Sequence, residues 1–89
     1  MWYVYIVMCA DGTLYTGTTV DVKRRVKEHN FSKKGAKYTR SRRPVSLVAF
    51  CPVKNRSLAL RLEHKIKSLN KGEKVAYLLK EASNDLESN

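Results

Sequence analysis

The sequence predicts an α+β (mixed αβ) domain whose strands and helices follow one another in the order β-β-α-β-α-α. Three apolar segments rich in β-branched and aromatic residues predict the strands, namely Trp2–Cys9, Leu14–Thr18 and Val45–Val53. Asp11-Gly12 separates the first two and predicts a hairpin turn, because glycine tolerates the positive φ that such turns need. Apolar residues at helical spacing then predict a long helix, and they are Leu58, Leu62, Ile66 and Leu69.

The first strand is apolar almost throughout, so we expect it at the centre of the sheet with both faces partly covered. Pro52 near the end of the third strand suits a strand terminus or a sheet edge. Cys9 and Cys51 each stand alone in an apolar segment, without the paired spacing or histidine partners of a zinc site. We therefore expect both cysteines to be reduced, buried packing residues.

The first helix is expected over residues 21–30, capped by a residue within Thr19–Asp21. Arg25 and His29, four residues apart, lie on one face of this helix. An adjoining apolar stripe that packs on the sheet consists of Val22 and Val26. Residues 30–43 carry serine, glycine and many cations but few core residues, so we expect a basic loop that Pro44 ends.

Asn55 or Ser57 can cap the second long helix, and Asn70–Gly72 is expected to end it. A last helix is expected from Glu73 to about Glu81. Its buried side would consist of Val75, Ala76, Leu78 and Leu79. These elements define one domain over residues 1–82, followed by a polar tail, residues 83–89, that we expect to fray.

The charge of the chain indicates a polyanionic partner. It has 18 Lys+Arg against 8 Asp+Glu, and ten of the 21 residues from Lys23 to Arg43 are Lys or Arg. We therefore expect nucleic acid as the partner. An acidic membrane surface is the rival, but the longest apolar run, Trp2–Ala10, is about half of the roughly 20 residues that a spanning helix needs. No secretory signal is recognisable, so we expect a cytoplasmic protein without a membrane partner.

Two tyrosine-centred segments give the chain its most specific pattern. Tyr3-Val4-Tyr5 lies on the first predicted strand, and Tyr15-Thr16-Gly17 lies on the second. The two strands are close enough in sequence to pair, and Glu63 is the only acidic residue between Glu28 and Glu73. Nothing in the chain is similar to a nucleotide-binding loop. Paired phenols, a basic segment and one isolated acid together indicate phosphodiester chemistry on a nucleic acid.

These segments, followed by the stretch from Arg24 to Asn30 and by Leu58–Glu63, resemble the GIY-YIG endonuclease superfamily. The resemblance covers about two thirds of the chain and is closest to the short single-domain bacterial branch related to structure-specific junction nucleases. Tyr3 and Val4 stand where the first motif usually has Gly and Ile, and Thr16 replaces the Ile of the second. Both phenols are kept.

The resemblance implies a central three-stranded antiparallel sheet flanked by helices, and cleavage of DNA with one divalent metal ion. By position, Tyr5 matches the proposed general base, Tyr15 the second phenol, Arg25 the phosphate-binding arginine and Glu63 the metal ligand. His29 matches a helix end of the junction-nuclease branch and is a further candidate catalytic residue. Many relatives also carry an Asn well after the glutamate. Asn70 and Asn84 are the nearest candidates here, and neither is assigned.

The chemistry of the residues supports those roles. Mg²⁺ or Mn²⁺ needs only one or two carboxylates plus substrate phosphate, so Glu63 is enough when DNA is bound. The planar guanidinium of Arg25 matches two phosphate oxygens. A tyrosine base is less favourable, because the ordinary pKa of about 10 leaves little phenolate at pH 7.

Each residue also has an ordinary structural interpretation. Tyr5 and Tyr15 could be sheet-packing aromatics, Glu63 could pair with Lys67 at i,i+4, and His29 could complement the helix dipole. The candidate nucleic-acid contacts could instead form a solubilising loop. In the DNA-binding interpretation Tyr38 would stack on an unpaired base, beside Lys23, Arg24, Lys33, Lys34, Lys37, Arg40, Arg42 and Arg43.

Two classes of function therefore stay open. The first is a metal-dependent endonuclease acting on branched, nicked or otherwise distorted DNA. The second is a nucleic-acid-binding module, for DNA or RNA, with a degenerate or partner-dependent nuclease site. Tyr5, Tyr15, Arg25 and Glu63 together favour the enzyme, because a binding module has no need of an acid facing phosphate. The lack of an appended targeting domain favours weak, shape-based selectivity or a partner protein.

Overall fold

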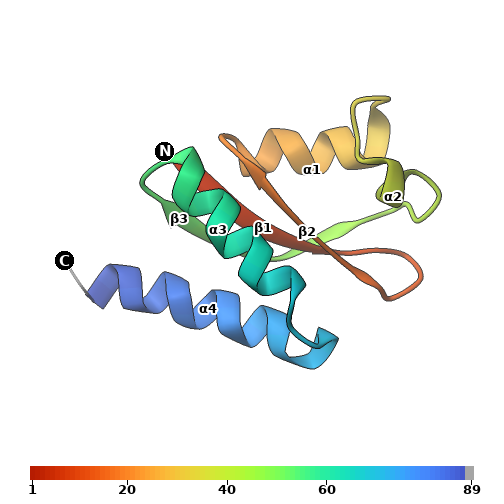
Figure 1. Ribbon diagram of the computed structural model, residues 1–89. Helices are drawn as coiled ribbons and strands as arrows, with labels where there is room; N and C mark the ends of the chain where they lie inside the picture. Colours follow the sequence, from red (N-terminus) through yellow and green to blue (C-terminus); the bar gives the residue numbers. More distant parts are fainter. Residues whose placement is uncertain (88–89) are drawn as a thin grey trace.

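A computed structural model describes residues 1–87, with side chains through residue 83, and confirms the α+β architecture. Strands β1 (Trp2–Met8), β2 (Leu14–Thr19) and β3 (Ser46–Val53) form one antiparallel sheet in the order β2-β1-β3. The long helices are α1 (Val22–Phe31), α3 (Arg56–Lys67) and α4 (Lys71–Glu87), as Figure 1 shows. The expected element order therefore holds for the strands and the long helices.

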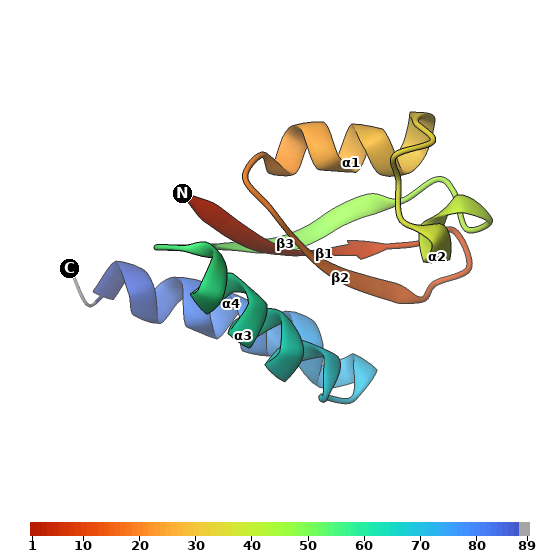
Figure 2. The same cartoon turned by 45° about the horizontal axis from the view of Figure 1, so that its top comes forward.

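The sheet lies between two helical layers, with α1 on one face and both α3 and α4 on the other (Figure 2). Because successive side chains of a strand point to opposite faces, β1 contributes to a core on each side. The α1 face buries Tyr5, Val7, Cys9 and Val45. The opposite face buries Val4, Ile6, Ala49, Cys51, Ala59, Ile66 and Leu78. The expected central strand and both buried cysteine thiols are thus confirmed.

Local signals in the sequence form as expected. Asp21 caps α1 by accepting the Arg24 N–H at 3.0 Å, and Asn55 caps α3 by accepting the Leu58 N–H at 2.9 Å. Gly12 adopts a φ of 84° in the β1–β2 turn, a conformation that side chains disfavour. No helix in the described part of the chain is long and apolar enough to cross a membrane.

The expected basic loop is partly helical. Helix α1 continues to Phe31, and a single turn, α2 (Lys37–Arg40), forms within the segment. This turn forms because Thr39 donates its backbone N–H and its hydroxyl to the Ala36 carbonyl, at 3.1 and 3.0 Å. Arginine side chains then hold the surrounding backbone, as described below.

The last helix is longer than expected. It begins at Lys71, contains Gly72 and continues to Glu87, whereas the sequence suggested Glu73 to about Glu81. Ala76 and Leu79 are exposed rather than buried, because α4 turns only the side bearing Val75, Leu78 and Ala82 to the sheet. Residues 88–89 of the tail expected to fray lie outside the described residues.

Candidate active site

Tyr5 is positioned by the pairing of β1 with β2. It lies directly opposite Gly17 in the register of the two strands. A β-carbon added to Gly17 would be 2.6 Å from the Tyr5 hydroxyl and 2.8 Å from the ring carbon that bears it, closer than real β-carbons approach. Glycine is therefore required for the phenol to lie across β2.

A buried hydrogen-bonded chain connects β1, α1 and α2. Tyr5 Oη lies 2.7 Å from His29 Nε2, and His29 Nδ1 lies 2.9 Å from Thr39 Oγ1. Tyr5 is 1% exposed, and His29 and Thr39 are 0% exposed. Buried polar groups without partners are costly, so each member of this chain fixes the others.

The hydrogen-bond partners assign the histidine tautomer. The Thr39 hydroxyl has one proton and donates it to the Ala36 carbonyl at 3.0 Å, so its oxygen accepts from His29 Nδ1–H. Nε2 is then unprotonated and accepts the Tyr5 phenol proton. The Ala36 N–H also points at Nδ1, but at 3.5 Å this contact is much longer than the 2.9 Å bond to Thr39.

Burial sets the charge states of this chain. Desolvation raises the pKa of Tyr5 to about 12; the Arg25 charge opposes this, and the charges of Tyr15 and Glu63 add to it. Desolvation and the positive charges of Arg25 and Arg43 lower the pKa of His29 to about 4, with Glu28 opposing. Both residues are neutral at pH 7. A neutral His29 at the end of α1 adds no charge to complement the helix dipole.

Arg25 lies beside this chain and is held on two sides. Its Nη1 donates to Glu28 Oε1 at 3.1 Å and to the Lys34 carbonyl at 2.7 Å. Its charge lowers the pKa of Tyr5, so it lies within electrostatic reach of the phenol. The guanidinium is fixed at the position where a phosphate beside Tyr5 would need a cation.

Glu63 reaches the same region from α3. Its charge raises the pKa of Tyr5, and its Oε2 is 3.3 Å from Lys67 Nζ. The suggested i,i+4 pair therefore forms, between one largely buried carboxylate and one exposed lysine. The described residues contain no cluster of three or more His, Cys, Asp or Glu that could hold a metal ion. One carboxylate fits a Mg²⁺ site completed by water and substrate phosphate, and does not fit a site made by protein ligands alone.

Tyr15 is the more accessible phenol and lies among aromatic and cationic groups. Its ring meets His29 edge-on at 5.3 Å between centroids and stacks on Tyr38 at 6.0 Å. Lys67 Nζ is 5.9 Å from the Tyr15 ring, and the Arg42 guanidinium lies 3.9 Å above Tyr38. A base stacking on Tyr38 would have to displace Arg42 or Tyr15. In this structure Tyr38 instead supports Tyr15.

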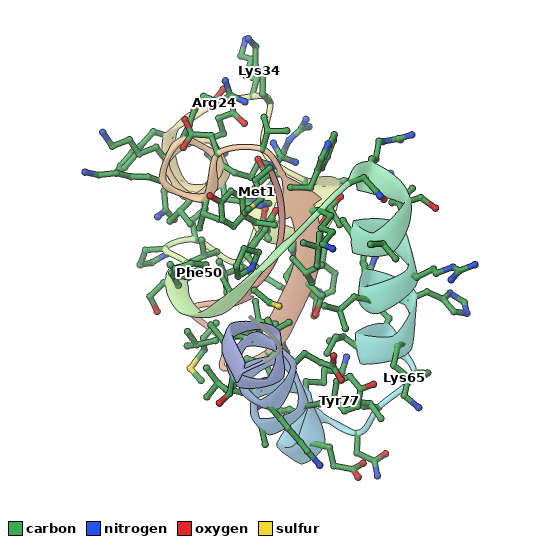
Figure 3. All side chains as sticks on the ribbon, turned by 90° about the vertical axis from the view of Figure 1, so that its left-hand side faces the viewer. Met1, Arg24, Lys34, Phe50, Lys65 and Tyr77 are labelled. Carbon is green, nitrogen blue, oxygen red and sulfur yellow. The ribbon has the colours of Figure 1, made fainter. Side chains whose placement is uncertain are left out.

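The candidate nucleic-acid contacts divide into two groups. The arginines hold the loop: Arg40 donates to the Lys33 carbonyl, Arg42 to Asp11 and the Tyr38 carbonyl, and Arg43 to the carbonyls of His29 and Ser32. The remaining cations are exposed, and their side chains make no ion pair within the described part of the chain. They are Lys23, Arg24, Lys33, Lys34 and Lys37. Figure 3 shows Arg24 and Lys34 projecting into solvent near α1.

Sequence reasoning gave no individual role to three residues that organise the site, although Asn30 belongs to the stretch that carries the family resemblance. Thr39 completes the buried chain, but no motif marks it in the basic segment. Glu28 pairs with Arg25, and their i,i+3 spacing was an available signal. Asn30 clamps the start of β3, because its side chain accepts the Val45 N–H at 2.7 Å and donates to the Val45 carbonyl at 3.0 Å.

Comparison with known proteins identifies the family of the domain. The profile of the GIY-YIG catalytic domain matches residues 1–76. A UPF0213 protein of Desulfotalea psychrophila is 59% identical over 78% of this chain and 63% of its own length. One of Haloquadratum walsbyi is 58% identical over 81% of this chain and 80% of its own length. The alignment thus spans less than two thirds of the Desulfotalea protein but four fifths of the Haloquadratum protein.

Solved structures show the same fold. The UPF0213 protein of Bacillus halodurans is 44% identical, has a TM-score of 0.55 and matches 92% of this chain and 87% of its own. A protein of Enterococcus faecalis is 38% identical with a TM-score of 0.60, over 88% of this chain and 82% of its own.

The fold and the matched profile define a domain of the nuclease-associated GIY-YIG class. The chain belongs to the GIY-YIG family and, within it, to the short UPF0213 proteins of bacteria and archaea. Asn70, one candidate for the downstream Asn of other members, is exposed, and its carbonyl accepts the Glu73 N–H at the start of α4. The side chain of Asn84 lies outside the described residues.

Proposed function

We propose that the protein is a divalent-metal-dependent endonuclease that hydrolyses phosphodiester bonds in branched, nicked or otherwise distorted DNA. The observation that carries this proposal is the convergence of Arg25, Tyr15 and Glu63 on the buried Tyr5–His29 hydrogen bond. Three different elements supply these groups, and a core-packing role explains neither the cation nor the acid. Tyr5, Tyr15, Arg25 and Glu63 are the proposed active-site residues, and His29 acts through Tyr5.

Arg25 would bind non-bridging oxygens of the phosphate to be cleaved. To do so, Arg25 would release Glu28 and bind phosphate. A bidentate contact between the guanidinium and phosphate would favour this exchange. Glu63 would hold one Mg²⁺ or Mn²⁺ ion, which supplies Lewis-acid stabilisation when bound. The pair of Glu63 with Lys67 does not prevent this. A partly exposed ion pair is worth at most about 1 kcal/mol, and Lys67 is half exposed.

Tyr5 would remove the proton from the attacking water. With a pKa of about 12 it is protonated in the free protein, and its proton is directed to His29 Nε2. Cations lower the pKa of a phenol, so binding of metal and phosphate beside Tyr5 would raise its ionised fraction. Because Tyr5 is 1% exposed, this role also requires that DNA binding opens the contacts over its hydroxyl.

One observation favours the second class of function, a nucleic-acid-binding module for DNA or RNA. The cation and the acid of the site are each neutralised within the chain, in the pairs Arg25–Glu28 and Glu63–Lys67. A partner protein or a degenerate site would be consistent with such pairs. The exposed lysines of the basic segment would then provide binding without cleavage.

The deciding experiment is a cleavage assay on labelled duplex, nicked, three-way-junction and single-stranded DNA of matched length, with an RNA strand in parallel. Each substrate is incubated with Mg²⁺, with Mn²⁺ and with EDTA. We expect metal-dependent cleavage that is fastest on junction or nicked DNA. If the protein binds all substrates but cleaves none of them under any condition, the endonuclease proposal is wrong and the nucleic-acid-binding module is the better account.

A further inference from the structure

Strand β3 forms an uncharged free edge of the sheet. It pairs only with β1, and no strand of the described chain covers its outer side. Free edges present unpaired N–H and C=O groups, and proteins usually protect them with charged residues, proline or β-bulges. Ser46–Val53 contains no charged residue, although Pro52 lies near its end and the register shift opposite Ile6 and Val7 makes a bulge at Val48. Its residues Leu47, Val48 and Phe50 are 40%, 37% and 47% exposed, so the edge is apolar as well as free.

Apolar hollows adjoin this edge on both faces of the sheet. The larger one, about 540 Å³, lies between α1 and β3 and is lined by Val22, Lys23, Val26, Lys27, Leu47 and Phe50. A smaller hollow of about 230 Å³ is lined by residues of β3 and by Leu79 of α4. Figure 3 shows Phe50 beside β3, between α1 and α4. An added strand has side chains on alternating faces, and both faces here offer an apolar hollow.

The charges around the larger hollow indicate which kind of partner would bind there. Lys23 and Lys27 stand one helical turn apart on α1, both are exposed, and the described chain provides neither with an ion-pair partner. A second copy of this chain would bring the same lysines and a net charge of +10, with no acid on its own β3. Nucleic acid would match the lysines but would place its sugar–phosphate backbone against an apolar floor.

We propose that the β3 edge and the hollow beside α1 bind an extended segment of a partner protein as a fourth strand of the sheet, and that the side of this segment facing α1 carries both apolar residues and Asp or Glu. Backbone hydrogen bonds to β3 would position the segment. Leu47 and Phe50 would contact its apolar side chains, and Lys23 with Lys27 would pair with its carboxylates.

The test uses the protein and a fluorescein-labelled peptide, Val-Thr-Glu-Thr-Val-Thr-Glu-Thr, which as a strand places Val and Glu together on one face and Thr on the other. We expect saturable binding below about 1 mM, and amide shifts in ¹⁵N spectra that centre on Ser46–Cys51 and α1. A peptide of the same composition in the order Val-Glu-Thr-Thr-Val-Glu-Thr-Thr should bind roughly tenfold more weakly, because as a strand it places Val and Glu on opposite faces. Equal binding of both peptides, or no binding of either, overturns the proposal.

Charge variants test whether peptide binding depends on this surface or only on the overall positive charge of the protein. Lys23→Glu with Lys27→Glu should weaken binding roughly tenfold, as expected for two charge pairs. Arg61→Glu with Lys71→Glu lowers the net charge equally from exposed positions on α3 and α4, and should change affinity less than about twofold. Leu47→Lys should abolish binding while leaving the melting temperature near that of the parent. An equal loss in both pairs of variants overturns the proposal.

Two further results assign the edge to another occupant and would also overturn it. The first is displacement of the peptide by a 12-nucleotide DNA strand, with the same amide shifts on β3. The second is a concentration-dependent dimer in sedimentation equilibrium that Leu47→Lys dissociates. The proposal predicts a monomer and DNA-induced shifts that avoid β3.

Discussion

Tyr5 Oη and His29 Nε2 lie 2.7 Å apart in a site where neither side chain reaches solvent. The pair joins the centre of the sheet to the last turn of α1, and Thr39 of α2 holds the other ring nitrogen at 2.9 Å. The basic segment is therefore connected to the active site through hydrogen bonds as well as through charge. A change at any of these three residues should affect both stability and cleavage.

Tyr5→Phe should keep the ring packing and lose on the order of 10²–10⁴ in single-turnover rate, the usual contribution of a general base. In the parent, the log of that rate should rise with unit slope between pH 6 and 9, because the pKa of Tyr5 is about 12. Tyr15→Phe should cost less if that phenol only orients water or phosphate, and Tyr3→Phe is the packing control. Parent-like cleavage by Tyr5→Phe would exclude Tyr5. His29 would then become the next candidate for the base.

His29 should make the folded state sensitive to acid. Its pKa is about 4 when folded against 6.5 for the ordinary side chain, so the unfolded state binds the proton more tightly. Stability from this group is fully present above pH 6.5 and falls as the pH drops toward 4, by up to about 3 kcal/mol. Urea unfolding of the parent and of His29→Gln between pH 4 and 7.5 measures this difference. His64→Gln, at an exposed position, should retain the parent slope.

Gly17→Ala should displace the Tyr5 phenol, because the new methyl group would lie 2.6 Å from its oxygen. We expect a loss of about 1–3 kcal/mol in stability, typical of overpacking, together with most of the cleavage. Gly72→Ala in α4 is the matched control. Nothing lies within 4 Å of its new methyl group, and alanine is the better helix former. That variant should be as stable as the parent or more stable, with unchanged activity.

The two groups of cations should respond differently to substitution. Replacing Lys33, Lys34 and Lys37 by Ala should leave folding unchanged and reduce the log-log salt slope of DNA affinity by about 0.9 for each phosphate that the variant no longer neutralises. Arg43→Ala should instead lower the melting temperature, because its guanidinium binds the carbonyls of His29 and Ser32. Salt titrations of DNA binding and thermal melts of both variants measure this. An unchanged salt slope in the lysine variant would mean that DNA binds elsewhere.

The sequence was sufficient to predict the sheet, its central strand and the helix caps, because apolar periodicity and capping residues act locally. It also named Tyr5 and Glu63. It did not predict that Arg40, Arg42 and Arg43 hold the loop, since a backbone carbonyl as partner leaves no trace in composition. The exposure of Leu79 was missed for a related reason. Helical spacing shows that a stripe exists, but the packing of α4 on the sheet decides which side of it is buried.

Glu63→Ala tests the central claim most directly, with Lys67→Ala as the matched control on the same helix. Cleavage of labelled DNA in Mg²⁺ and DNA affinity at one fixed salt concentration are measured for both variants and the parent. The proposed site predicts that Glu63→Ala abolishes metal-dependent cleavage and binds DNA as well as the parent or slightly better, because one negative charge near phosphate is removed. Lys67→Ala should keep cleavage. Undiminished metal-dependent cleavage by Glu63→Ala would contradict the assignment of the metal site.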